Sequence, residues 1–127
     1  MSEINDSAMI AALRRQMTVA VARQVAAAGN LANIDTPGYR AKEATFDDAL
    51  SRHIPAAKAG NAGRIEAAGV EPVIQEIRGL PERRDGNTVQ LDRELLTMGK
   101  AAGDFAAAQT ALAAKFRLVR YAINEGR

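Results

Sequence analysis

The sequence predicts a mainly α-helical protein, in which two long terminal helices form an antiparallel, coiled-coil-like hairpin joined by an irregular central arm. Apolar side chains recur at alternating steps of three and four residues near both ends of the chain, which is the spacing of paired helices. All 4 prolines and seven of the 10 glycines lie between Gly29 and Gly86, where they interrupt regular structure. Only 4% of the 127 residues are aromatic and much of the apolar content is alanine, which suits close helix packing better than a deep enzymatic pocket.

The first predicted helix runs from about Ser7 to Ile34. Asn5 and Asp6, like Ser7, are suitable N-cap residues, because their side-chain oxygens accept hydrogen bonds from the free N–H groups of a first turn. Thr36-Pro37 ends the helix, since the residue before a proline is pushed out of the helical region. The predicted pairing seam of this helix consists of Ile10, Leu13, Met17, Ala20, Gln24, Ala27, Leu31 and Ile34.

An irregular, glycine- and proline-rich arm is predicted to follow. Pro37-Gly38 fits the central positions of a type II turn at its start. Val70–Ile77 can form a short β segment, which Pro72 restricts to the edge of a sheet. Phe46–Leu50 can form one helical turn, and Ala56–Gly69 has the small, polar composition of a flexible linker. We expect partners to order this arm.

The second predicted helix runs from about Thr88 to Ile123. Asn87 as its N-cap, with Gln90 three residues later, resembles a capping box. Asp92 and Glu94 lie in the first turns, where the helix dipole favours negative charge. The predicted seam consists of Leu91, Leu95, Met98, Ala102, Phe105, Gln109, Leu112, Phe116, Val119 and Ile123.

One antiparallel register matches the single polar residue of each seam. It places Gln24 beside Gln109 and Ile10 beside Ile123. A buried polar layer costs stability but can specify the alignment of two helices. The alternative is that each glutamine faces solvent or another subunit.

The predicted organisation has three parts that form one structural domain from both termini. Residues 1–38 form the N-terminal helix and turn, residues 39–87 the arm, and residues 88–127 the C-terminal helix. A hairpin of this length buries only one stripe of each helix. Apolar side chains outside the seams therefore predict contacts with other chains. These side chains are Val19, Val21, Val25, Leu96, Leu118 and Tyr121.

The composition argues against catalysis and cofactor binding. The chain has no cysteine, which excludes disulfides, thiolate metal sites and thiol chemistry. His53 is the only histidine and has no second ligand of its type, so we expect no metal, no cofactor and no enzymatic activity. The net charge is +2 and the basic residues are scattered, whereas nucleic-acid surfaces concentrate them. A helical-hairpin adaptor and a basic nucleic-acid-binding protein are the rival interpretations.

Residues 30–40 read Asn-Leu-Ala-Asn-Ile-Asp-Thr-Pro-Gly-Tyr-Arg, directly after the first heptad pattern. This segment resembles the N-terminal signature of flagellar axial proteins, the family of rod, hook and hook-associated subunits. Within the family, the short chain, residues 85–94 and the terminal helix resemble subunits of the proximal rod; a rod subunit of the FlgC type is the alternative. The resemblance does not extend to residues 51–84. It marks as family-signature and interface residues Asn30, Ala32, Asn33, Thr36, Pro37, Gly38, Tyr39 and Arg40.

The resemblance implies a structural role in the bacterial flagellum. Such subunits are exported through the flagellar type III secretion channel and stack helically into the drive shaft that crosses the periplasm. The implied partners are copies of the chain itself, FlgC-like rod proteins, the junction protein FliE and the export gate. Arg14 and Arg15 interrupt the apolar run that a secretory signal peptide needs. We therefore expect export without a cleaved signal and no membrane span.

Overall fold

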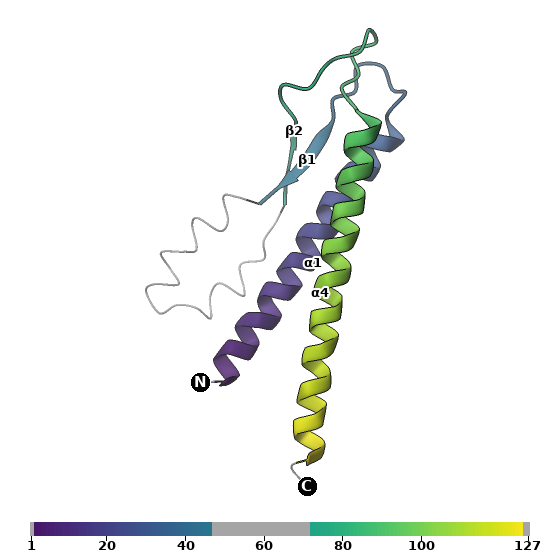
Figure 1. Ribbon diagram of the computed structural model, residues 1–127. Helices are drawn as coiled ribbons and strands as arrows, with labels where there is room; N and C mark the ends of the chain where they lie inside the picture. The colour runs from purple at the N-terminus through teal and green to yellow at the C-terminus, as the bar shows by residue number, and fades with distance from the viewer. Residues whose placement is uncertain (1, 47–71, 126–127) are drawn as a thin grey trace, which may run out of the picture.

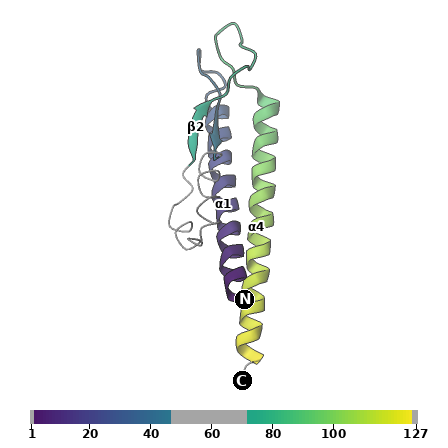
Figure 2. The same ribbon diagram turned by 90° about the vertical axis from the view of Figure 1, so that its left-hand side faces the viewer.

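Two long antiparallel helices dominate the computed structural model, which describes residues 2–46 and 72–125. Helix α1 spans Ser2–Ala32 and helix α4 spans Leu91–Glu125. They pack along each other and meet at the end where the connecting segments lie, while α4 extends past the N-terminal end of α1 (Figures 1 and 2). The mainly α-helical hairpin is confirmed. The predicted helical turn after Phe46, the linker at Ala56–Gly69 and His53 lie outside the described residues.

A small antiparallel sheet packs against one side of α1. Strand β1 spans Lys42–Thr45 and strand β2 spans Val73–Glu76, and their register pairs Lys42 with Glu76 and Thr45 with Val73. The short β segment predicted between Val70 and Ile77 therefore forms. In Figure 2 the sheet and α4 lie on opposite sides of α1.

The start of α4 differs from the prediction. The first helical hydrogen bond runs from the Glu94 N–H to the Gln90 carbonyl at 3.1 Å, so Gln90 occupies the cap position and Asn87 does not. The segment predicted to be the first turn is not helical, and its Thr88 N–H donates to the Tyr39 carbonyl at 3.0 Å. Tertiary hydrogen bonding has replaced the local capping box.

The contact between the two helices is made by alanines. Ala20 and Ala27 of α1 and Ala101 and Ala108 of α4 are all buried, and the members of each pair are one heptad apart. Small side chains let helix backbones approach closely, as they do where alanines or glycines face each other. On α4 the buried stripe that faces α1 consists of Glu94, Ala101 and Ala108. None of these residues belongs to the predicted seam, so α4 is rotated about its axis relative to the prediction.

The register also differs from the prediction. The Gln16 side chain donates to the Asp104 carbonyl at 3.4 Å, and the Lys115 ammonium lies 2.5 Å from the Asp6 carboxylate. These contacts shift the alignment by about three helical turns from the one that pairs the glutamines. Gln109 is exposed, so the Gln24–Gln109 layer does not form. The cause is the polar network at the connected end of the hairpin, which aligns the end of α1 with the beginning of α4.

The other predicted seam residues divide into two groups. Nine are half-buried beside the alanine contact: Ile10, Leu13, Met17, Gln24, Leu31, Ile34, Met98, Phe105 and Leu112. Five large side chains remain 41% to 67% exposed, namely Leu91, Leu95, Phe116, Val119 and Ile123, and the predicted seam residue Ala102 is exposed as well. Leu95 is exposed because α4 is rotated so that Glu94 and Ala101 face α1 instead. Val119 and Ile123 lie near or beyond the level where α1 begins. The last turns of α4 therefore carry an apolar face with no helix opposite it.

No helix within residues 2–46 and 72–125 has an apolar stretch long enough to cross a membrane.

Candidate functional site

The signature segment forms a hydrogen-bonded junction with the chain that enters α4. We call this junction the clasp and define it as residues 30–42 together with residues 83–89. It closes the connected end of the hairpin (Figure 1). Three asparagine side chains carry most of its polar contacts.

Asn30 ties the last turn of α1 to strand β1 and is completely buried. Its amide nitrogen donates to the Lys42 carbonyl at 2.8 Å, and its amide oxygen accepts from the Lys42 N–H at 2.9 Å. The same oxygen accepts from the Tyr39 hydroxyl at 3.3 Å. The side chain thus satisfies both backbone groups of one residue on the edge of β1.

Asn33 closes the C-terminal end of α1. Its amide nitrogen donates to the Gly29 carbonyl at 2.8 Å, and its amide oxygen accepts from the Thr36 hydroxyl at 3.1 Å. The last carbonyls of a helix have no intrahelical partner and need such donors. Asn33 therefore acts within its own turn, rather than reaching another part of the clasp.

Asn87 joins the two ends of the clasp and is also completely buried. Its amide nitrogen lies within 3.1 Å of the carbonyls of Asn33, Ile34 and Thr36, and its amide oxygen accepts from the Val89 N–H at 2.7 Å. The Arg83 guanidinium donates to the Ile34 carbonyl as well. Two donors from the α4 side thus satisfy the free carbonyls beyond α1.

Two glycines allow the two ends of the clasp to touch. Gly38 and Gly86 have φ angles of +75° and +83°, in the left-handed region that glycine adopts without a steric cost. A Cβ on Gly86 would lie 3.3 Å from the Gly38 Cα. The Gly38 N–H donates to the Asp85 carbonyl at 2.8 Å. The Tyr39 N–H donates to the Thr36 carbonyl at 3.2 Å, which closes the turn over Pro37-Gly38.

A charged cluster connects strand β1 to the helix contact. Glu94 is only 1% exposed, and its carboxylate lies 3.2 Å from the Arg93 guanidinium. The same guanidinium lies 3.8 Å from Glu43 in β1. Arg93 therefore links the first turn of α4 to the sheet and offsets the buried charge of Glu94.

The signature residues divide into an inner and an outer group. Asn30 is buried, and Asn33 and Tyr39 are half-buried. The outer group is exposed and consists of Ala32, Thr36, Pro37, Gly38 and Arg40. Arg40 lies 3.5 Å from Glu82, and both side chains are about half exposed. The outer group is thus held in a defined shape on the surface by the inner group.

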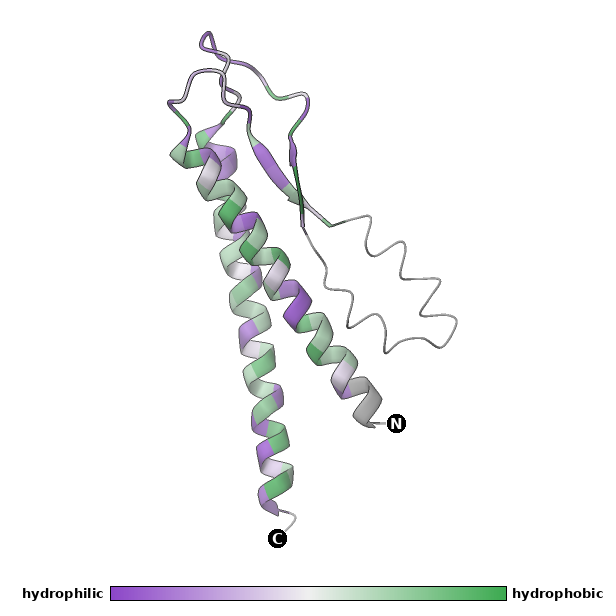
Figure 3. Cartoon of the chain, turned by 180° about the vertical axis from the view of Figure 1, so that it is seen from behind, coloured by the Kyte–Doolittle hydropathy of each residue, from purple (hydrophilic) through white to green (hydrophobic). Residues whose placement is uncertain are grey.

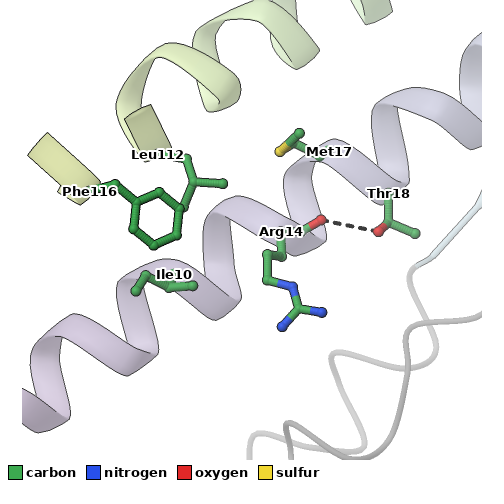
Figure 4. Close-up of a pocket in the computed structure, with 6 residues that line it drawn as sticks. All are labelled: Ile10, Arg14, Met17, Thr18, Leu112 and Phe116. Atoms are coloured by element: carbon green, nitrogen blue, oxygen red, sulfur yellow. Dashed lines mark hydrogen bonds between the residues drawn. The ribbon is translucent and has the colours of Figure 1, made fainter. Parts of the chain in front are cut away.

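Hydrophobic residues recur along the whole length of α4 (Figure 3), and several of the large ones are exposed. Leu96, Leu118, Tyr121 and Ile123 are at least 67% exposed. A shallow groove also lies where α1 and α4 diverge, and Ile10, Met17, Leu112 and Phe116 face it (Figure 4). Its lining has no acid, base and nucleophile set that would serve catalysis, and the described residues contain no group of acidic or histidine side chains suited to a metal ion.

Comparison with known proteins identifies the family. The chain is 33% identical over 99 residues to the flagellar basal body rod protein FlgB of Escherichia coli (strain K12), and the match covers 66% of this chain and 72% of that protein. It is 32% identical over 84 residues to FlgB of Yersinia enterocolitica, covering 57% of this chain and 61% of that protein. The chain belongs to the FlgB family of flagellar basal body rod proteins. No protein-family model matches the sequence.

Membership of the FlgB family makes the chain a structural subunit of the bacterial flagellar basal-body rod. It supports the rod interpretation over the FlgC-type, adaptor and nucleic-acid alternatives. The match to the Yersinia enterocolitica protein spans less than two thirds of that protein's length. The family predicted from the resemblance of residues 30–40 is confirmed by these relatives.

Two functional positions were not predicted as such. The sequence predicts a local cap at Asn87, whereas its side-chain amide lies within hydrogen-bond distance of three carbonyls beyond α1. Glu94 was assigned to a favourable place near the helix dipole, although it is buried at the helix contact. For Asn87 the sequence does carry a signal, because Asp85-Gly86-Asn87 is typical of a turn, in which an Asn side chain hydrogen-bonds to backbone groups. For Glu94 the sequence carries no signal, because helix rotation decides its burial.

Proposed function

We propose that this FlgB-family chain builds the proximal part of the rod, where it stacks helically with copies of itself and with neighbouring rod subunits and carries out no catalysis. The single observation that carries the proposal is the exposed apolar surface of α4. Side chains such as Leu118 and Ile123, each 67% exposed, have no partner helix in the hairpin. Clustered exposed apolar side chains on a small protein mark surfaces that other chains cover.

The contrast between the tightly held clasp and the exposed helix faces supports a structural role in the rod. We propose that both termini form one structural unit, in which the alanine contact and the clasp hold α1 and α4 in a defined geometry. A shaft that transmits torque needs rigid subunits joined by many shallow contacts, each small and collectively large. The clasp supplies the rigidity, and the free faces of the helices supply the contacts.

Membership of the FlgB family supports other rod components as partners. We propose that the outer group of the signature, with Arg40 and Pro37 at its centre, contacts adjacent subunits. These would be further copies, FlgC-like rod proteins, the junction protein FliE and the export gate. A photoreactive amino acid at Ala32 should therefore cross-link to a rod component in isolated basal bodies. Cross-linking only to unrelated proteins would remove the signature from the interface.

Complementation of motility tests the function itself. A strain lacking its own copy of this gene should swim when it carries the wild-type chain, and should not swim with Leu118→Glu, because a charge would have to be buried between subunits. Gln109→Glu is the matched control, since Gln109 is an exposed polar residue on the same helix. Normal swimming with Leu118→Glu would contradict the proposal that this face is covered in the rod.

A further inference from the structure

The side of α4 that faces away from α1 carries a second heptad pattern. We call it the outer face, and it begins at Asp92 and ends at Arg117. Its residues follow one another at alternating steps of four and three, which places them along one stripe of the helix. Every residue of this stripe is exposed. The sheet and α1 both lie on the other side of α4 (Figure 2), so the described residues leave the outer face uncovered.

The stripe is complementary to itself when it is read in the opposite direction. If a second copy of α4 lies antiparallel, with the Asp92 of each copy level with the Arg117 of the other, each large side chain meets a small one and each acid meets a base. The resulting level pairs are Asp92 with Arg117, Leu96 with Ala113, Gly99 with Thr110 and Gly103 with Ala106.

We propose that the outer face of α4 is the docking surface for a second copy of this chain, which packs antiparallel to form a two-fold dimer of subunits outside the rod. The charge pairs at both ends select the second copy in this direction, because a parallel, in-register pair would place Asp92 beside Asp92 and Arg117 beside Arg117. The small residues in the middle let the two helices approach closely.

Two-fold pairing separates this dimer from assembly of the rod. A two-fold contact uses the same surface on both subunits and closes, whereas head-to-tail contacts between different surfaces generate an open helical filament. The antiparallel pair therefore cannot be the repeating contact of a helical shaft. It covers Leu96, which is 74% exposed in the single chain. The dimer thus shields an apolar side chain of the unassembled subunit. Its formation does not depend on the proposed contacts within the rod.

The chain offers a steric test that leaves the subunit itself intact. A Cβ built on Gly103 has no atom within 4 Å, so a leucine there fits the single chain but fills the closest point of the dimer. Sedimentation of the purified full chain should show a monomer–dimer equilibrium, and Gly103→Leu should weaken the dimer by about a hundredfold, as overpacking does in a tight contact. The matched control is Ala102→Leu, because Ala102 is exposed on another side of α4.

Charge exchange tests the direction of packing. Asp92→Arg and Arg117→Asp should each weaken the dimer by about tenfold, since each replaces two attractive pairs by two repulsive ones. The double variant should restore the dimer. An equimolar mixture of the two single variants should form mixed dimers in preference to either homodimer. Circular dichroism checks that each variant keeps its helix content.

Cross-linking through single cysteines tests the alignment, because the chain has no cysteine of its own. Ala106→Cys lies near the two-fold axis and should join two copies through a short bis-maleimide. Tyr121→Cys lies far from its counterpart in an antiparallel pair and should not. Equal cross-linking at both positions would indicate a parallel pair. A parallel pair would overturn the proposal. So would a purified chain that stays monomeric at every concentration, or a dimer that neither Gly103→Leu nor charge reversal weakens.

Discussion

The two ends of the helical hairpin differ in how they are held together. At the connected end, buried asparagines and paired glycines satisfy specific backbone groups in the clasp. At the open end, the described contacts are an ion pair between Lys115 and Asp6 and a shallow apolar groove. Buried hydrogen bonds demand one geometry, whereas apolar contacts tolerate several. The clasp end therefore defines the subunit, and the open end is left to adapt to neighbours.

Replacing Asn87 should give the largest loss of stability. Asn87→Ala removes the donor for three carbonyls in a buried site, and it should lower the free energy of unfolding by about 3 kcal/mol. Urea unfolding followed by circular dichroism measures the effect. Gln109→Ala, a change at an exposed position of α4 outside the outer face, is the control. A loss no larger than that of the control would mean that the clasp does not define the subunit.

Overpacking the alanine contact should be the next largest effect. Ala101 is 2% exposed against α1, so Ala101→Leu should force the helices apart and cost about 2 kcal/mol in the same unfolding measurement. Ala102→Leu changes an exposed neighbour by the same number of atoms and should be close to neutral. Equal effects of the two variants would show that the helices are not in close contact at Ala101.

Two glycines should respond to alanine in opposite directions. Gly86→Ala places a side chain on a residue with φ of +83°, close to the Gly38 backbone, and should cost about 1 kcal/mol. Gly29 is helical and has open space at its Cβ position, so Gly29→Ala should stabilise the chain by up to about 1 kcal/mol. Thermal unfolding of the two variants compares the signs. Destabilisation by both would point to an unrecognised contact at Gly29.

The open end should show the smallest change in stability. Ile123→Glu alters a side chain that is 67% exposed, and it should change the free energy of unfolding by less than about 0.5 kcal/mol. Motility should nevertheless be lost if neighbours cover this position. A large loss of stability in the purified chain would instead place Ile123 inside the subunit.

Much of the site could be located from the sequence, although its internal contacts could not. The segment at residues 30–40 stands out, since an Asn-rich stretch followed by Pro37-Gly38 has to end a helix in a turn. The partner of that segment could not be inferred, because it lies at Asn87 and hydrogen bonds between residues far apart in sequence leave no local pattern. The role of the exposed signature residues stays a prediction.

By itself, the sequence determined that this chain has two long helices, an interrupted middle and a turn at Pro37-Gly38, because heptad spacing and the backbone limits of proline and glycine act over a few residues. Only the tertiary structure decided which residues face each other. Ala20 and Ala27 lie at the contact as the seam of α1 predicts, whereas on α4 the contact is made by Ala101 and Ala108 rather than by the larger predicted side chains. The register follows from the clasp, because several buried hydrogen bonds outweigh a single favourable pairing of glutamines.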